Sequence, residues 1–272
     1  MTEKRAVVAG SRAELAELVA DKFVVRVRKC VKRQGVAHVV LTGGSVARDV
    51  HRAIAAHPDR ASVDWSVVHF WWGDERFLPS GDLERNEQQA TDDMLDSLGV
   101  TAECIHRMPA ALPDLTPADA AGAYAAELAS HAAKGDDWPI FDIAFAGVGP
   151  DGHVLSVFPG SPHASLDSET VVGVDDSPKP PPQRVTMSIP LLNRAKRVWM
   201  VASGADKAPA IGLALAGAHV SEVPAAGLSG TSSTKVFIDA ELATEVPEDL
   251  VERQRFWSAD DERADYVPNA LR

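Results

Sequence analysis

The chain alternates short, mostly apolar segments of six or seven residues with longer segments whose apolar residues recur every three or four positions. The short segments are rich in β-branched and aromatic residues, which indicates buried strands, and the longer ones predict helices. Strands are predicted at residues 36–41, 67–72, 141–146, 196–202 and 234–239. Helices are predicted at residues 11–34, 45–57, 86–98, 117–134 and 207–218. This order predicts an α/β fold with a mostly parallel sheet and helices on both faces.

The 272 residues are enough for one large domain with a full hydrophobic core. We predict a single α/β domain over residues 1–242, followed by an acidic extension, residues 243–272, with little periodicity. A proline-rich segment, residues 174–184, cannot continue a helix or a strand and is predicted to be a surface loop within the domain.

Charge and cysteine content exclude several classes of protein. The formal net charge of −12 argues against nucleic-acid binding, which needs a basic face. The two cysteines, Cys30 and Cys104, are far apart in the sequence and suggest neither a disulfide framework nor a zinc site. No secretory leader or membrane-spanning apolar run is recognised. We therefore expect a cytoplasmic protein that binds neither nucleic acid nor membrane.

Ligands of parallel α/β sheets bind beyond the carboxyl ends of the strands, so the segments that follow the strands are the place to look for chemistry. After the strand at 36–41 comes Thr-Gly-Gly-Ser, with Gly43, Gly44 and then Ser45 as the expected N-cap of the next helix. Two glycines at a helix start can expose free N–H groups that hold a phosphate. An ordinary strand-to-helix turn is the alternative.

Charged residues follow two other strands. Asp74, Glu75 and Arg76 come directly after the strand at 67–72, where a solvated turn is the alternative to a ligand site. Asn86 opens the next predicted helix, either as a cap or as a ligand residue. Lys207 is expected in the first turn of an apolar helix, where the helix dipole disfavours a cation unless an anion is bound. A surface lysine extending into solvent is the alternative for Lys207.

The segment after the strand at 141–146 reads GVGPDGH and has the glycine spacing G-x-G-x-x-G. That spacing alone is weak evidence for a dinucleotide site, and Asp151 would repel a pyrophosphate there. His153 lies in this turn and not on an apolar helical face. Because imidazole titrates near neutral pH, His153 is the predicted general base, with Asp151 orienting either the ring or a substrate.

Five ordered motifs resemble those of 6-phosphogluconolactonases, of the glucosamine-6-phosphate isomerase/6-phosphogluconolactonase family. They are LTGGS (41–45), FWWGDERFLP (70–79), FDIAFAGVGPDGHVLSVFPGSP (141–162), DDSPKPPPQRVTMSIPLLNRA (175–195) and SGADKA (203–208). The resemblance spans roughly residues 5–240 and implies a modified Rossmann-like, three-layer αβα sandwich. It also implies hydrolysis of the δ-lactone of 6-phosphogluconate in the pentose phosphate pathway, with neither metal nor cofactor.

Carried over residue by residue, the resemblance implies that His153 activates water and that two acids, Asp74 and Asp151, lie near the sugar. The implied phosphate- and sugar-binding positions are Gly43, Gly44, Ser45, Arg76 and Lys207. Asn86 matches the family motif, whereas its neighbour Arg85 replaces the usual serine, and Arg184 is a further pocket candidate. The implied partner is a phosphorylated sugar lactone, and we expect a monomer or weak dimer.

Three other functions are considered. The related glucosamine-6-phosphate deaminases carry a glutamate five residues beyond the histidine, where this chain has Phe158, which cannot transfer protons. A non-catalytic sugar-phosphate sensor would have no use for His153. A nicotinamide oxidoreductase is disfavoured by Pro150 and Asp151 between the glycines.

Overall fold

A six-stranded parallel sheet forms the centre of the computed structural model, which describes residues 2–244, 246, 250 and 251. Its strand order is β1-β9-β8-β5-β2-β3, and every adjacent pair is parallel. The strands are β1 (Lys4–Ala9), β2 (Ala37–Leu41), β3 (Val68–Trp72), β5 (Ile143–Gly147), β8 (Arg197–Ala202) and β9 (Ser233–Asp239). The four inner strands are almost wholly buried, which explains their continuous apolar runs.

A second, antiparallel sheet has the order β4-β7-β6. Its strands are β4 (Asp74–Arg76), β6 (Val171–Val174) and β7 (Arg184–Met187). The short β4 begins two residues after β3, so the chain passes directly from the large sheet to the small one.

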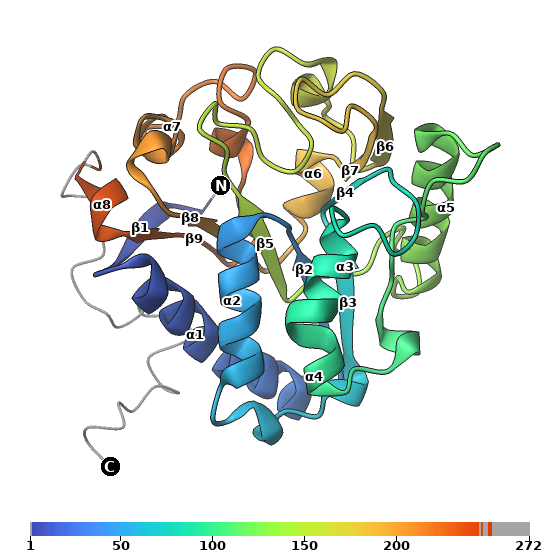
Figure 1. Cartoon of the computed structure of the whole chain (residues 1–272), viewed down its shortest axis with the longest axis horizontal. Coiled ribbons are helices and arrows are strands. Elements are labelled where there is room, and N and C mark those ends of the chain that lie inside the picture. The colour runs from blue at the N-terminus through green and yellow to red at the C-terminus, as the bar shows by residue number, and fades with distance from the viewer. Residues whose placement is uncertain (1, 245, 247–249, 252–272) are drawn as a thin grey trace.

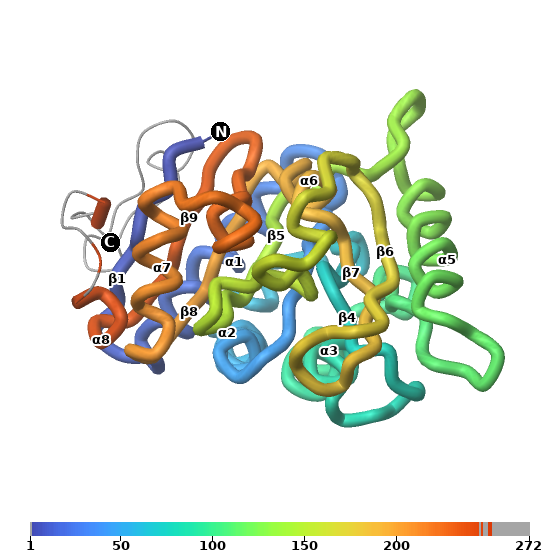
Figure 2. Tube along the Cα trace, turned by 90° about the horizontal axis from the view of Figure 1, so that it is seen from above, coloured from blue at the N-terminus to red at the C-terminus, as the bar shows by residue number. Residues whose placement is uncertain are grey.

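Helices flank the large sheet and cover the small one. They are α1 (Arg12–Gln34), α2 (Ser45–Ala56), α3 (Asn86–Ala90), α4 (Asp96–Leu98), α5 (Pro117–Ser130), α6 (Ile189–Leu192), α7 (Ala208–Leu215) and α8 (Ala240–Ala243). Helices α1 and α2 pack together against the large sheet, while α5 packs on β6 and β7 at the other end of the molecule from α8 (Figures 1 and 2). Within the described residues, no helix combines the length and apolar character needed to cross a membrane.

The longest helix shows why the sequence predicts its ends well. Ser11 accepts a hydrogen bond from the Glu14 N–H at 3.2 Å and so caps the start of α1. Gly35 ends the helix with a φ of +77°, and its N–H donates to the Val31 carbonyl at 2.8 Å. A left-handed residue at this position favours glycine.

The structure confirms the predicted α/β fold with a mostly parallel sheet. All five predicted strands are present, with ends shifted by no more than two residues. Strand β1 and the small sheet are absent from the prediction. The helix predicted at 86–98 is present in three parts. A π-helical turn, Thr91–Leu95, which has a wider hydrogen-bonded turn than an α-helix, separates α3 from α4.

The predicted boundary at residue 242 stays a prediction, because most of the extension lies outside the described residues. Of the described part, Val246 is buried in the core and Val251 forms a parallel bridge with Ala6 at the edge of β1.

Candidate functional site

A cavity of about 210 Å³ lies beyond the carboxyl ends of β2, β5 and β8, next to the small sheet. Nine of the ten predicted site residues line it: Gly43, Gly44, Ser45, Asp74, Arg76, Asn86, His153, Arg184 and Lys207. The tenth, Asp151, contacts the His153 ring. The structure therefore brings together residues from five separate stretches of the chain, although their roles stay predictions.

The start of α2 provides backbone N–H groups to one side of the cavity. Gly44 is the N-cap, with a φ of +100° that an L side chain rarely adopts, and no side chain caps the helix. The expectation that Ser45 is the N-cap is wrong by one residue. Gly44 has the non-helical backbone of an N-cap, with a positive φ, and Ser45 is already the first helical residue. The uncapped N–H groups and the positive end of the helix dipole favour an anion.

Gly43 is required for packing and not for its φ. A Cβ at this position would overlap the Asn86 side-chain amide. Asn86 Nδ2 donates to the Asp74 carbonyl at 2.9 Å, and its Oδ1 accepts from the Arg76 guanidinium at 3.1 Å. Asn86 is thus the first residue of α3 and not its cap, and it fixes Arg76 beside the cavity.

The Asp74–Arg76 segment is a strand and not the solvated turn considered as an alternative. Pairing of β4 with β7 buries Asp74 and Glu75. Asp74 Oδ2 accepts from the Ser156 hydroxyl at 2.8 Å. Glu75 accepts from the N–H groups of Asn86 and Glu87 at 2.7 and 2.9 Å, and so caps α3 from outside the helix. Burial raises the pKa of Glu75 to about 7, against the opposing effects of Arg85 and these N–H groups.

Arg184 holds the proline-rich loop in place from the first position of β7. Its guanidinium donates to the carbonyls of Pro181 (2.9 Å), Lys179 (3.1 Å) and Pro180 (3.0 Å). Burial lowers the pKa of Arg184, although a guanidinium remains charged at any physiological pH. The segment expected to be a surface excursion is therefore anchored at the rim of the cavity.

The glycines of the GVGPDGH turn let the His153 side chain fold back onto the turn. A Cβ on Gly149 would overlap both the His153 ring and the Asp151 carboxylate. Gly152 has a φ of +83°, which favours glycine. Two of the three glycines in the G-x-G-x-x-G spacing thus have a structural role that involves no dinucleotide.

His153 Nδ1 lies 2.5 Å from Asp151 Oδ1, so a proton must lie between them. With Nδ1 protonated, the lone pair of the neutral ring is on Nε2, which has no hydrogen-bond partner within the described part of the chain. The ring stacks on Phe158 at a centroid distance of 4.6 Å. Burial lowers the pKa of His153, and Lys179 acts in the same direction, while Asp151 opposes both. The balance favours the neutral imidazole.

Lys179 is a residue that sequence reasoning missed. Its Nζ lies 3.2 Å from Asp151 Oδ1 and 3.1 Å from His153 Nδ1, although 26 residues separate it from the histidine. Burial on its own would raise the pKa of Asp151, but the His153 and Lys179 contacts lower it overall. A single lysine within a proline-rich loop was the available signal, and nothing in the sequence places it beside the histidine.

Lys207 lines the cavity from the segment after β8. It is the N-cap of α7, so the expectation that it lies in the first turn of the helix is wrong by one residue. A 3-10 turn, Ala205–Lys207, precedes the helix because Gly204 turns the chain with a φ of +101°. Lys207 Nζ donates to the Ser203 carbonyl at 2.7 Å and lies 3.9 Å from Asp206 Oδ1.

His51, on α2, also lines the cavity and was not predicted. Its ring is buried, and Nδ1 has no hydrogen-bond partner among the described residues. Burial lowers the pKa of His51 to about 4, so the ring is uncharged. A histidine on the inner face of an amphipathic helix is indistinguishable in sequence from a core residue.

The comparisons with known proteins agree with the motifs. The family model described as "Glucosamine-6-phosphate isomerases/6-phosphogluconolactonase" matches residues 10–237. The chain belongs to this family. A protein from Streptomyces coelicolor named 6-phosphogluconolactonase is 41% identical over 244 residues, covering 87% of this chain and 92% of the relative. A Mycobacterium tuberculosis protein of the same name is 39% identical over 235 residues, covering 86% and 94%.

Solved structures of the glucosamine-6-phosphate isomerase/6-phosphogluconolactonase family share the fold. The 6-phosphogluconolactonase from Trypanosoma brucei has a TM-score of 0.77 at 24% identity, covering 91% of this chain and all of that one. A monomeric glucosamine-6-phosphate deaminase has a TM-score of 0.71 at 20% identity, covering 89% and 99%. These comparisons confirm the predicted family, the fold and an enzyme of this type. The fold alone does not distinguish lactone hydrolysis from deamination.

Proposed function

We propose that the protein hydrolyses 6-phospho-D-glucono-1,5-lactone to 6-phospho-D-gluconate in the oxidative pentose phosphate pathway. The observation that carries this proposal is the imidazole of His153, which is paired with Asp151 through Nδ1 and has no hydrogen-bond partner at Nε2 among the described residues, in the same cavity as the proposed phosphate donors. The names of the bacterial relatives at about 40% identity support the same substrate.

Binding of the phosphate would rely on local donors, because the chain as a whole is acidic. The uncapped N–H groups of α2 at Gly44 and Ser45 provide one side of this site. Arg76 and Lys207 provide the cations. The role of these groups is to hold the sugar in one orientation, so that its lactone carbonyl meets the catalytic histidine.

In the proposed reaction, His153 Nε2 removes a proton from water as the water oxygen bonds to C1 of the lactone. The tetrahedral intermediate then breaks the bond between C1 and the ring oxygen, which takes the proton from the imidazolium. The ring opens to an acid, which loses its proton to solvent. Asp151 holds the Nδ1–H tautomer and orients the ring, as a carboxylate does for a catalytic histidine elsewhere.

Lys179 is assigned a positioning role. Its ammonium group contacts Asp151 and the Nδ1 side of His153, so it restrains the carboxylate and disfavours a doubly protonated ring. A general base must be unprotonated at the working pH, and the nearby Lys179 ammonium group favours the unprotonated imidazole by lowering its pKa.

The deaminase alternative lacks a group that it needs. Phe158 stacks on the ring of His153, where the related deaminases carry a glutamate for proton shuttling. Hydrolysis requires only a base, a placed water and hydrogen-bond donors for the oxyanion. A sensor that does not catalyse would have no need for the Asp151–His153 pair beside its phosphate donors.

A direct assay distinguishes these functions. Opening of 6-phosphogluconolactone is followed by acid release against the spontaneous background, with unphosphorylated gluconolactone as the matched substrate. We expect a much larger kcat/KM for the phosphorylated lactone, and no ammonia from glucosamine 6-phosphate. Ammonia release, or lactone opening at the background rate, would refute the proposal.

A further inference from the structure

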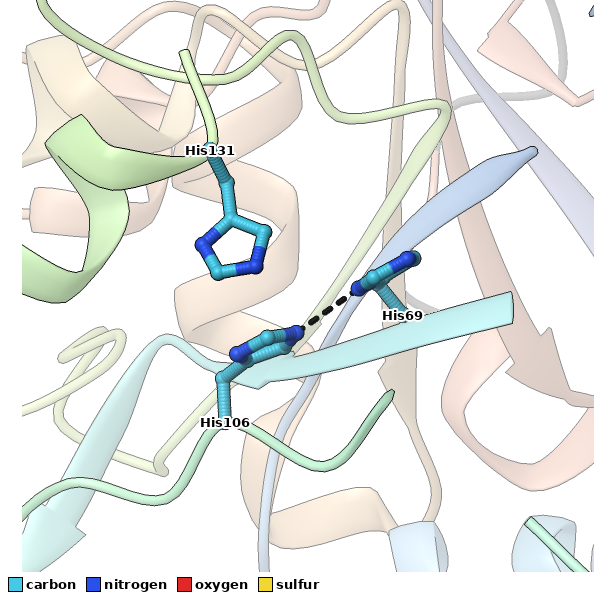
Figure 3. Close-up of side chains that lie close together, drawn as sticks. All are labelled: His69, His106 and His131. Atoms are coloured by element: carbon cyan, nitrogen blue, oxygen red, sulfur yellow. Dashed lines mark hydrogen bonds between the residues drawn. The ribbon is translucent and has the colours of Figure 1, made fainter. Parts of the chain in front are cut away.

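Three histidines cluster away from the residues that line the catalytic cavity, between β3 and the end of α5. His69 is the second residue of β3, His106 follows a 3-10 turn at Ala102–Cys104, and His131 is the C-cap of α5. Their rings point toward one another (Figure 3), and a nitrogen from each lies within 4.8 Å of the other two. The catalytic cavity lies beyond the carboxyl end of the sheet, whereas His69 is near the start of its strand.

The central histidine of this cluster is held rigidly. The His106 ring is buried and stacks on Trp71 at a centroid distance of 3.8 Å and an angle of 9°. Its backbone N–H donates to the Phe70 carbonyl at 2.9 Å, which fixes the segment against β3. The ring therefore has one orientation, set by packing and by the neighbouring strand.

Hydrogen bonds assign the tautomers. His106 Nδ1 lies 2.7 Å from Glu127 Oε1, and because the carboxylate only accepts, Nδ1 carries the proton. His106 Nε2 then has a lone pair, which accepts from His69 Nδ1 at 2.8 Å. A histidine that donates one nitrogen to a carboxylate and presents the other is the arrangement found at protein-bound zinc.

The surroundings of two of the three rings favour the neutral form of imidazole. Burial, followed by the repulsion of the neighbouring histidines, lowers the pKa of His69. Burial likewise lowers the pKa of His106, although Glu127 opposes it. Neutral imidazoles have lone pairs for a metal, whereas imidazolium does not.

We propose that His69 Nδ1, His106 Nε2 and a ring nitrogen of His131 bind one Zn²⁺ ion, with water in the fourth position and Glu127 hydrogen-bonded behind His106. Imidazole ligands favour Zn²⁺ over Mg²⁺ and Ca²⁺, which prefer oxygen. When zinc takes Nδ1 of His69, the proton on that nitrogen moves to Nε2 through solvent, so His69 binds as a neutral ring.

Small shifts would complete the tetrahedral geometry. Zinc–nitrogen bonds of about 2.0–2.1 Å place the ligand nitrogens ~3.3 Å from one another. The His69 and His106 nitrogens must separate slightly from 2.8 Å, and His131 must approach. His131 lies at a helix end with its side chain 29% exposed, and its Nδ1 contacts Ser130 Oγ at 2.9 Å and the Glu127 carbonyl at 3.1 Å. Zinc would then link β3, the His106 segment and α5.

His38 is not part of the proposed site. It stacks on His69 at a centroid distance of 4.8 Å, but its Nδ1 accepts from the Trp71 indole at 3.2 Å. The histidines are separated by 37 and 25 residues, so no metal-binding spacing marks them in the sequence.

The test uses the full chain after removal of metals with a chelator. Zn²⁺ is titrated in competition with a chromophoric chelator, for the native protein, His131→Gln, His106→Gln and a control, His219→Gln, whose exposed ring lies outside the cluster. We expect one zinc per native chain, with affinity weakened at least tenfold in His131→Gln and unchanged in His219→Gln. Zinc, unlike Mg²⁺, should raise the melting temperature of the native and His219→Gln proteins by several degrees.

Two outcomes would overturn the proposal: equal zinc affinity in the native protein and His131→Gln, or no stoichiometric zinc on the native chain. The half-exposed position of His131 makes its variant informative even where His106→Gln does not fold. Substitution of Co²⁺ gives a second measurement, since tetrahedral coordination produces visible absorption bands that His131→Gln should lose. Lactonase activity of His131→Gln should equal that of the native protein, which separates this site from the catalytic one.

Discussion

Replacement of Lys179 by methionine tests the electrostatics of the proposed base most directly. The substitution retains an apolar stem of similar length and removes the charge 3.1 Å from His153 Nδ1. Because the lysine side chain is 41% exposed, its interaction is screened by water. Coulomb's law at this distance, in a water-like dielectric, gives ~1.3 kcal/mol of repulsion against an imidazolium. That energy corresponds to about a tenfold change in the protonation equilibrium of the ring.

The sign follows from the role of the histidine as a base. Lys179 lowers the pKa of His153, and without it the pKa rises, since Asp151 then acts unopposed by the ammonium. Only the deprotonated ring removes a proton from water, so activity is lost as pH falls through that pKa. The acid limb of kcat/KM should therefore move to higher pH in Lys179→Met, with kcat/KM on that limb reduced by about tenfold.

The assay is a pH profile of kcat/KM, corrected at each pH for spontaneous lactone opening. Lys179→Arg keeps the charge and should retain the native profile, and Lys134→Met, at an exposed position outside the cavity lining, controls for loss of one surface charge. An unmoved acid limb in Lys179→Met, or the same displacement in Lys179→Arg, would refute the electrostatic reasoning.

Three further substitutions test the site. His153→Ala should lower kcat by a factor of ~10²–10⁴ with little effect on KM. A near-native kcat in steady-state kinetics would contradict the role of His153 as the base. Lys207→Ala should raise KM for the phosphorylated lactone and leave unphosphorylated gluconolactone unaffected, so equal effects on both substrates would contradict a phosphate role. Gly149→Ala should reduce kcat, because its Cβ overlaps the His153 ring and the Asp151 carboxylate. A native pH profile and kcat for Gly149→Ala would show that this ring position is not needed.

The sequence predicts the strands that are buried on both faces, because their apolar runs reflect burial directly. Strand β1 begins with Lys4 and Arg5 at the edge of the sheet, where side chains are half exposed and the apolar signal is weak. Strand β4 consists of Asp74, Glu75 and Arg76, and its pairing partner lies more than a hundred residues later. Pairing with β7, and not local preference, makes this acidic segment a strand.

Glycines and charged residues that follow the strands could be proposed as site residues from the sequence, because a parallel sheet brings the carboxyl ends of its strands together. The sequence alone predicted the α/β fold and the family, and it proposed ten site residues, nine of which line the cavity. The tertiary structure alone decided that Lys179 contacts Asp151 and His153, and that His51 lines the cavity. It also brought His69, His106 and His131 together. Local patterns record burial and turn geometry over a few residues, whereas contacts across long stretches of chain exist only once the sheets have formed.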